Sequence, residues 1–211
     1  MARLQTRRRT MSVLVACEES QAVCVAFREL GYEAYSCDLE PCSGGHPEWH
    51  IQADALELLK LRWDIVIAFP PCTYLTNAGN RWLYHAGGLN QDRYSKGMKA
   101  KDFFLKFLQS DCPHIAVENP RPAPVFDMPP ASQEIQPYMF GHPFTKATRL
   151  WLRGLPLLMA TDIVVPEYTW CPSSKSGSNG YAAHNGKARS KTFPGIARAM
   201  AEQWGRYIYE K

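Results

Sequence analysis

A cysteine preceded by two prolines is the residue of this sequence best suited to covalent chemistry. Residues 69–79 read Phe-Pro-Pro-Cys-Thr-Tyr-Leu-Thr-Asn-Ala-Gly and follow an apolar run at 64–68. Because Pro70 and Pro71 fix the backbone where that run ends, the side chain of Cys72 is presented in a defined direction. A thiol in a polar setting can ionise to a nucleophilic thiolate, whereas a thiol in an apolar core stays inert. The pattern therefore predicts a cysteine nucleophile.

A carboxylic acid ends another apolar run further along the chain. The sequence Val-Glu-Asn-Pro at 117–120 places Glu118 directly after a predicted strand. If Glu118 faces the same cleft as Cys72, partial burial would raise the pKa of its carboxyl group and make it an acid or hydrogen-bond donor. A glutamate before Asn-Pro is, on its own, typical of a turn. The hypothesis of a thiol–carboxyl pair therefore depends on the two strands being neighbours.

The alternation of short apolar runs with amphipathic segments indicates the elements that position these residues. Strands are predicted at residues 13–16, 33–36, 50–53, 64–68, 114–117, 138–140 and 149–152. Helices are predicted at residues 21–30, 56–61, 98–108 and 193–209, the first with Ser20 as its N-cap and Gly31 as its stop. Strands and helices in this order form right-handed crossovers, so we expect an α/β fold with a mostly parallel sheet and helices on both faces.

The carboxyl ends of the predicted strands carry most of the polar candidates. In sheets of this kind ligands bind beyond those ends, where this chain has Glu18, Asp38, Asp54, Cys72 and Glu118. Asp38 is placed to accept hydrogen bonds from both hydroxyls of a ribose. Asp54 is placed to accept a hydrogen bond from the exocyclic amine of adenine. Either aspartate alone is typical of a turn or a cap. Two in succession favour a nucleoside cofactor.

A metal site is the rival interpretation of the same region. The candidate zinc ligands are Cys37, Cys42, His46 and His50. Their spacing is not that of a standard zinc finger, and they lie between the two aspartates in cofactor positions. We therefore predict no metal.

Together, these residues resemble the DNA cytosine carbon-5 methyltransferase family, and in particular its compact phage and prophage members. The resemblance extends in order from residue 13 to residue 204. It is carried by the nucleophile signature at 69–79, the Glu-Asn-Val motif at 118–120 with proline in place of valine, the basic strand motif at 140–152 and the closing helix at 193–204. It implies a Rossmann-like methyltransferase fold that uses S-adenosylmethionine and needs no metal.

The resemblance also implies a reaction. Cys72 attacks carbon-6 of a cytosine while Glu118 holds ring nitrogen-3, and carbon-5 then takes the methyl group of S-adenosylmethionine. Lys146 and Arg149 hold a phosphate or the carbonyl oxygen of the base, and a cytosine in duplex DNA must first be flipped out of the stack. The implied catalytic residues are Cys72, Glu118 and Arg149. The implied cofactor-binding residues are Ala16, Glu18, Ser20, Asp38, Asp54 and Pro70. The implied substrate-binding residues are Pro71, Thr76, Asn119 and Lys146. Arg81 and Arg189 are added as substrate-binding residues because basic and aromatic residues alternate around them.

Three departures from the family pattern keep alternatives open. Residues 16–20 replace the family's glycine-rich loop, Phe144-Thr145 stands where a glutamine is usual, and the region between Trp151 and Arg189 is too short for a full target-recognition domain. The same chemistry on a free pyrimidine nucleotide or on RNA is one alternative. A catalytically inactive module that binds nucleic acid or protein is another.

Length and charge agree with one enzyme domain that binds two different ligands. The 211 residues predict a basic tail at 1–10, a single catalytic domain at 11–211 and a short irregular insertion at 153–191. Residues 11–71 hold three basic and ten acidic residues, whereas residues 141–191 hold seven basic and two acidic residues. Basic and aromatic residues alternate around Arg81, as suits contact with nucleic acid. Seven cysteines without a regular framework, short apolar runs and the lack of a secretory pattern predict a cytoplasmic protein without membrane segments. No oligomeric state is predicted.

Overall fold

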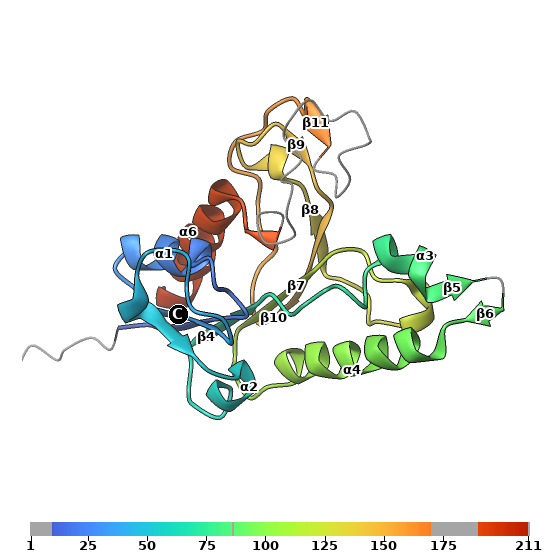
Figure 1. Ribbon diagram of the computed structural model, residues 1–211. Helices are drawn as coiled ribbons and strands as arrows, with labels where there is room; N and C mark the ends of the chain where they lie inside the picture. Colours follow the sequence, from blue (N-terminus) through green and yellow to red (C-terminus); the bar gives the residue numbers. More distant parts are fainter. Residues whose placement is uncertain (1–9, 86, 170–189, 211) are drawn as a thin grey trace, which may run out of the picture.

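A seven-stranded, mostly parallel sheet forms the centre of the molecule (Figure 1). The structure is a computed structural model that describes residues 10–85, 87–169 and 190–210. The strands of the sheet, in spatial order, are β3 (His50–Gln52), β2 (Glu33–Asp38), β1 (Ser12–Ala16), β4 (Ile65–Ala68), β7 (Ile115–Asn119), β10 (Thr148–Arg153) and β8 (Gln133–Ile135). The first five pair in parallel, and β10 is antiparallel to both of its neighbours. The strand order reverses between β1 and β4, which is the switch point of a Rossmann-like sheet.

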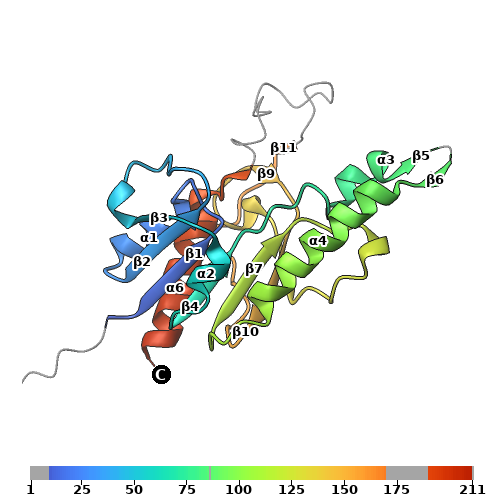
Figure 2. The ribbon, with the colours of Figure 1, turned by 60° about the horizontal axis from the view of Figure 1, so that its bottom comes forward.

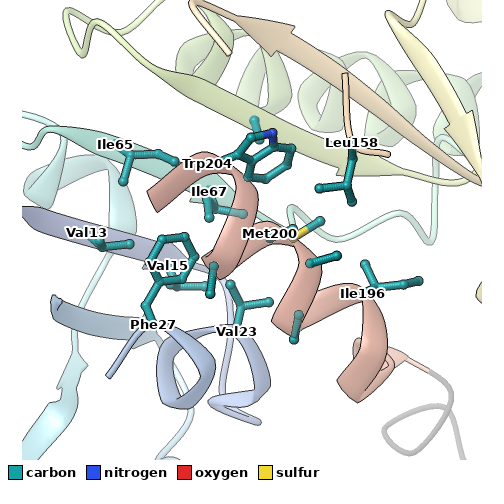
Figure 3. Close-up of a cluster of buried hydrophobic side chains, with 14 of the residues drawn as sticks. Val13, Val15, Val23, Phe27, Ile65, Ile67, Leu158, Ile196, Met200 and Trp204 are labelled. Atoms are coloured by element: carbon teal, nitrogen blue, oxygen red, sulfur yellow. The ribbon is translucent and has the colours of Figure 1, made fainter. Parts of the chain in front are cut away.

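Helices cover both faces of this sheet, as expected from the sequence. The helices are α1 (Ala22–Glu29), α2 (Ala55–Leu58), α3 (Asn80–Leu83), α4 (Gln91–Leu108) and α6 (Pro194–Tyr209), with short 3-10 turns η1 (Pro47–Trp49), η2 (Asn77–Gly79), η3 (Pro124–Phe126) and η4 (Pro137–Met139). On one face α1 packs against α6, where Trp204 and Phe27 are fully buried over β1 and β4 (Figure 3). On the other face α2 and α4 bury a second cluster that includes Phe104 and Phe107. The prediction of an α/β, Rossmann-like fold is confirmed.

The sequence of β4 shows why the nucleophile lies at a rigid point. All four residues of β4 are buried, as expected for a central parallel strand covered on both faces. The next peptide still belongs to the sheet, because Phe69 N–H donates to Ala16 O at 2.9 Å. Pro70 cannot donate a ladder hydrogen bond, so the strand ends there. Cys72 therefore follows a fixed element with only two residues of turn between them.

Three predicted elements differ from those in the structure. Gln21, at φ 59°, is the N-cap residue of α1 in place of Ser20, and it makes no side-chain capping bond. Helix α4 begins at Gln91 and not at residue 98, because Asn90 Oδ1 accepts a hydrogen bond from Arg93 N–H and caps a longer helix. Residues 138–140 fall at the 3-10 turn η4 after Pro137, and the edge strand at this point is β8.

An arm extends from the carboxyl edge of the sheet. It consists of η2, α3, the hairpin of β5 (Tyr84–His85) and β6 (Gly88–Leu89), and the first turns of α4. Figures 1 and 2 show these elements together at one end of the molecule, beyond the sheet. Leu83 is 2% exposed and anchors the arm to the α4 side of the core. A second small sheet pairs β9 (Phe144–Thr145) with β11 (Tyr168–Thr169).

The part of the chain that the structure describes contains no disulfide, since its six cysteines are all free. None of the helices in this part combines the length and the apolar character needed to cross a membrane.

Candidate active site at the carboxyl edge of the sheet

Two loops at the carboxyl edge are fastened to each other. The nucleophile loop (residues 69–76) follows β4, and the acid loop (residues 118–123) begins within β7, the strand next to β4. Ala123 N–H donates to Leu75 O at 2.8 Å, Asn77 N–H donates to Arg121 O at 2.9 Å, and Thr76 and Pro122 form an isolated β-bridge. At the base of the loops Asn119 Nδ2 donates to Pro70 O at 3.5 Å. These contacts hold the two loops in a fixed relation.

The thiol of Cys72 and the carboxyl group of Glu118 interact electrostatically between these loops. Burial raises the pKa of Cys72, and a Glu118 carboxylate raises it further, whereas Lys146 lowers it. Burial also raises the pKa of Glu118, and Lys146 opposes that shift. Glu118 and Lys146 therefore both shift the pKa of Cys72, and Lys146 also shifts the pKa of Glu118. At neutral pH the pair holds protons more strongly than the isolated groups would.

Glu118 and Lys146 line a small pocket of about 20 Å³. Thr148 on β10 also lines the pocket, as do residues in the first turns of α6 and just before it. The complete lining is Phe69, Glu118, Lys146, Thr148, Ser190, Thr192, Phe193, Ile196 and Met200. Lys146 Nζ lies 5.8 Å from the centre of the Phe193 ring, which places a cation over an aromatic face beside the acid. The pocket thus combines an acid, a cation and an aromatic surface.

The structure does not bring Arg149 into this pocket. Successive side chains of a strand point to opposite faces, and Leu150 belongs to the core cluster under α6 while Trp151 belongs to the cluster under α4. Arg149 therefore shares the α4 face with Trp151, and its Nε donates to Glu134 Oε2 at 3.1 Å. The pocket-lining residue of β10 is Thr148, which the sequence analysis missed. Because side chains two residues apart in a strand point to the same face, the position of Lys146 would have indicated Thr148.

Arg93 belongs to the basic and aromatic segment that the sequence links to nucleic acid, and the structure places it against the nucleophile loop. Its Nη2 donates to Thr73 O at 2.9 Å, and its guanidinium lies 5.2 Å from the centre of the Tyr74 ring. Both contacts fall on the two residues directly after Cys72. Arg93 thereby ties the first turn of α4 to the nucleophile loop. The contact joins residues twenty positions apart, so no local pattern indicates it.

The predicted cofactor aspartates do come together at the edge above β1, β2 and β3. Burial raises the pKa of Cys17, which directly follows β1, and Asp38, Cys37 and Asp54 raise it further, so the two carboxylates lie near the same thiol. Asp38 Oδ1 accepts from Glu40 N–H at 3.0 Å, and Asp54 Oδ1 accepts from Leu56 N–H at 2.9 Å as the cap of α2. Both side chains thus also have the turn and cap roles that such residues commonly fill.

Glu18 occupies the N-terminus of α1. Its carboxyl oxygens accept hydrogen bonds from Val23 N–H at 2.7 Å and Cys24 N–H at 3.2 Å, and the side chain is 4% exposed. Burial raises the pKa of Glu18 to about 8, although both N–H groups oppose the shift. Glu18 thus satisfies the orphan donors of the helix in place of a ligand or of the predicted cap Ser20.

The loop after β2 is held over this edge by Gln21. The fully buried Gln21 side chain donates to His46 O at 2.8 Å and accepts from His46 N–H at 3.0 Å. From the other side of the edge, Lys191 Nζ donates to Ser43 Oγ at 3.3 Å. The loop after β2 therefore contacts both the start of α1 and the segment that leads into α6.

The rival zinc ligands have other partners. His50 uses both ring nitrogens, one with Ser36 Oγ and one with Glu40 O, each at 2.9 Å. His46 stacks on Trp49 with ring centres 4.0 Å apart. Within the described residues no group of three histidine, cysteine or carboxylate side chains is arranged to hold a metal ion.

The remaining predicted residues are distributed around the edge. Ala16 is buried at the end of β1 and Pro70 is buried beside it, whereas Pro71 is exposed. Thr76 caps η2 through its contact with Ala78 N–H. Arg81 lies on the arm, with its guanidinium 5.0 Å from the centre of the Trp82 ring. Arg189 lies outside the described residues.

His142, in its neutral form, hydrogen-bonds to the first turn of α6, the helix that lines one part of the pocket. His142 Nε2 accepts from Gly195 N–H at 3.0 Å, and burial lowers the pKa of His142 against the opposing effect of Asp162. Since the folded state binds this proton less tightly than the unfolded state, stability is expected to fall as the pH drops below the usual histidine range. Substitution His142→Gln should remove that acid-sensitive step from the thermal midpoint measured between pH 8 and pH 5. A midpoint that falls equally in both proteins contradicts this role.

The fold and the site together define a Rossmann-like α/β protein that has acidic side chains at the ends of β2 and β3 and a thiol–carboxyl pair at the ends of β4 and β7. No family model matches the sequence, and no curated protein matches it. Among solved structures, the chain is similar to one described as a DNA modification methyltransferase encoded within a prophage of E. coli, with 11% identity and a TM-score of 0.43. It is also similar to the Entamoeba histolytica methyltransferase EhMeth, with 13% identity and a TM-score of 0.45. Each alignment covers 74% of this chain, which spans 52% and 58% of the two matched chains.

Proposed function

We propose that this protein transfers a methyl group from S-adenosylmethionine to carbon-5 of cytosine in DNA through a covalent bond to Cys72. The observation that carries the proposal is the pairing of Cys72 with Glu118 on two loops that are fastened to each other at adjacent strand ends. A pyrimidine ring needs both groups. Its carbon-5 becomes nucleophilic only when a thiolate adds at carbon-6 and an acid stabilises the ring nitrogen.

The residues present fit the nucleoside half of the cofactor. Asp38 and Asp54 both raise the pKa of the Cys17 thiol, and their carboxylates would accept hydrogen bonds from the ribose hydroxyls and the adenine amine. Bound S-adenosylmethionine supplies an electrophilic methyl group on a sulfonium. At the methionine end the chain has Glu18 on the N-terminus of α1 instead of a glycine-rich turn. The methionine end of the cofactor would therefore contact the carboxyl group of Glu18, because the N–H groups of Val23 and Cys24 already donate to that carboxyl group.

In this mechanism each residue has one task. Cys72 gives its proton to solvent water and forms a bond from Sγ to carbon-6 of the cytosine, while Glu118 donates its proton to nitrogen-3, where the displaced ring electrons are held. Lys146 binds a phosphate or the carbonyl oxygen of the base beside Phe193. Methyl transfer to carbon-5 would leave S-adenosylhomocysteine, and the proton on carbon-5 then passes to a base such as water. Elimination restores the ring, returns the proton of nitrogen-3 to Glu118 and releases the Cys72 thiolate.

A mechanism-based inhibitor tests the proposal directly. Fluorine at carbon-5 cannot leave as a proton, so DNA containing 5-fluorocytosine should remain bonded to Cys72 once the methyl group has been added. Incubation with S-adenosylmethionine should give a complex that survives denaturation, with the adduct mapped to the peptide that contains Cys72 by mass spectrometry. Parallel reactions with RNA and with free deoxycytidine monophosphate distinguish the alternative substrates. Absence of an adduct on every substrate, under conditions in which the cofactor binds, excludes the covalent mechanism.

A further inference from the structure

We infer that the arm binds an unpaired nucleic acid strand, through base stacking on Trp82 and Tyr84, and delivers it to Cys72. This inference deepens the proposed function, on which it rests for the fate of the strand. It concerns a surface distinct from the pocket around Glu118. The arm begins at residue 77, directly after the nucleophile loop, and projects from the edge where β7 ends (Figure 2).

The arm carries two large aromatic side chains, Trp82 and Tyr84, that are not buried in its core. Trp82 is 59% exposed and Tyr84 is 49% exposed, while Leu83 between them is 2% exposed and supplies the contact with the core. The chain changes from helix to strand at this point, and both aromatic side chains face solvent on either side of the buried leucine. Exposed aromatic surface of this kind marks a binding site more often than a structural one.

Charge identifies nucleic acid as the partner. Residues 72–101 hold five basic residues and one acidic residue, in contrast to the three basic and ten acidic residues of 11–71. The guanidinium of Arg81 lies 5.0 Å from the centre of the Trp82 ring, and that of Arg93 lies 5.2 Å from the centre of the Tyr74 ring. A cation on one face of an aromatic ring leaves the other face for a base and its positive charge for a phosphate.

The geometry favours a single strand over a duplex. Bases in a duplex already stack on each other, so exposed side chains reach their faces only where the strand is unpaired. Tyr74, two residues after Cys72, is 37% exposed and offers a further aromatic ring between the thiol and the arm in the sequence. A strand held in this way brings an unpaired cytosine to the thiol without the cost of flipping it out of a helix.

Binding measurements without cofactor test the inference separately from catalysis. The probe is a fluorescein-labelled DNA oligonucleotide of mixed sequence, used as a single strand and as the matched duplex, with affinity read by fluorescence anisotropy. The single strand is expected to bind at least tenfold more tightly. Trp82→Ala and Tyr84→Ala should each weaken its binding by about tenfold, whereas Trp82→Phe should retain most of it. Ile163→Ala, which removes a side chain 73% exposed elsewhere on the surface, is the matched control.

Salt dependence and the covalent assay separate the possible failures. Arg81→Gln should reduce the slope of log affinity against log salt by about 0.7, while the aromatic variants leave it unchanged. Equal affinity for duplex and single strand, or wild-type affinity of Trp82→Ala and Tyr84→Ala, overturns the inference. If the single strand binds through these residues but no adduct forms with 5-fluorocytosine, the surface is retained and the proposed reaction is refuted. If the adduct forms at the wild-type rate in a variant that carries both Trp82→Ala and Tyr84→Ala, the reaction stands and the role of the arm is refuted.

Discussion

Cys72→Ser is expected to lower the rate of methyl transfer to cytosine by about a thousandfold or more, because a serine hydroxyl does not ionise to a nucleophile at this site. Serine is close to cysteine in size, so the fastened loops should keep their arrangement. The measurement is single-turnover transfer of a labelled methyl group, with the thermal midpoint of each variant as a check of folding.

Cys112→Ser is the matched control for this substitution. Cys112 lies before β7, at the opposite end of the strand from Glu118, and its thiol can donate its one hydrogen to either Trp63 O or His114 O. A serine hydroxyl also has one hydrogen to donate to either carbonyl, so activity should be retained. A Cys72→Ser variant that keeps more than a tenth of wild-type activity would contradict a covalent role for Cys72.

The second large effect is expected for Glu118→Gln, which should lower the rate about a hundredfold while making Cys72 more reactive. The amide cannot donate an acidic proton to ring nitrogen-3, so catalysis loses its acid. A Glu118 carboxylate raises the pKa of Cys72, and the neutral amide removes that effect. Alkylation of Cys72 by iodoacetamide at a fixed alkaline pH should therefore become faster. A purely structural role for Glu118 would not produce opposite changes in the two rates.

Stability gives an independent test of the same residue. Burial raises the pKa of Glu118 in the folded protein, so the folded state holds this proton more tightly than the unfolded state. The stability that this carboxyl group contributes is complete below its unfolded pKa and is lost as the pH rises through its folded pKa. Glu118→Gln should thus raise the thermal midpoint increasingly above pH 5. Glu57→Gln, at an exposed carboxylate paired with Lys60, should show no such trend.

The sequence predicts the central pair of the site because parallel strands align their ends. Cys72 and Glu118 each follow an apolar run, and a right-handed crossover makes the two strands neighbours. The contribution of β10 was harder to predict. The sequence analysis paired Lys146 with Arg149 by type of charge, whereas the alternation of side chains places Thr148 on the face of the pocket.

Other features depend on contacts between distant residues. Ser20 has the right type for a cap, but Gln21 is engaged by the loop at His46, and Glu18 reaches the first turn of α1 instead. Helix α4 extends seven residues further toward its N-terminus than predicted, because Asn90 caps it and Arg93 binds the nucleophile loop. Propensity within a short window carries no record of such contacts.

The bridge between Thr76 and Pro122 separates the loops that carry Cys72 and Glu118 from the arm. Most contacts that set the separation of thiol and acid lie between β4 and residue 77 and between β7 and residue 123, and Arg93 of α4 adds one hydrogen bond to Thr73 O. The hairpin of β5 and β6 lies on the other side and contacts neither group. Its length and side chains could therefore be exchanged as a module, changing which nucleic acids are captured while the reacting groups keep their spacing.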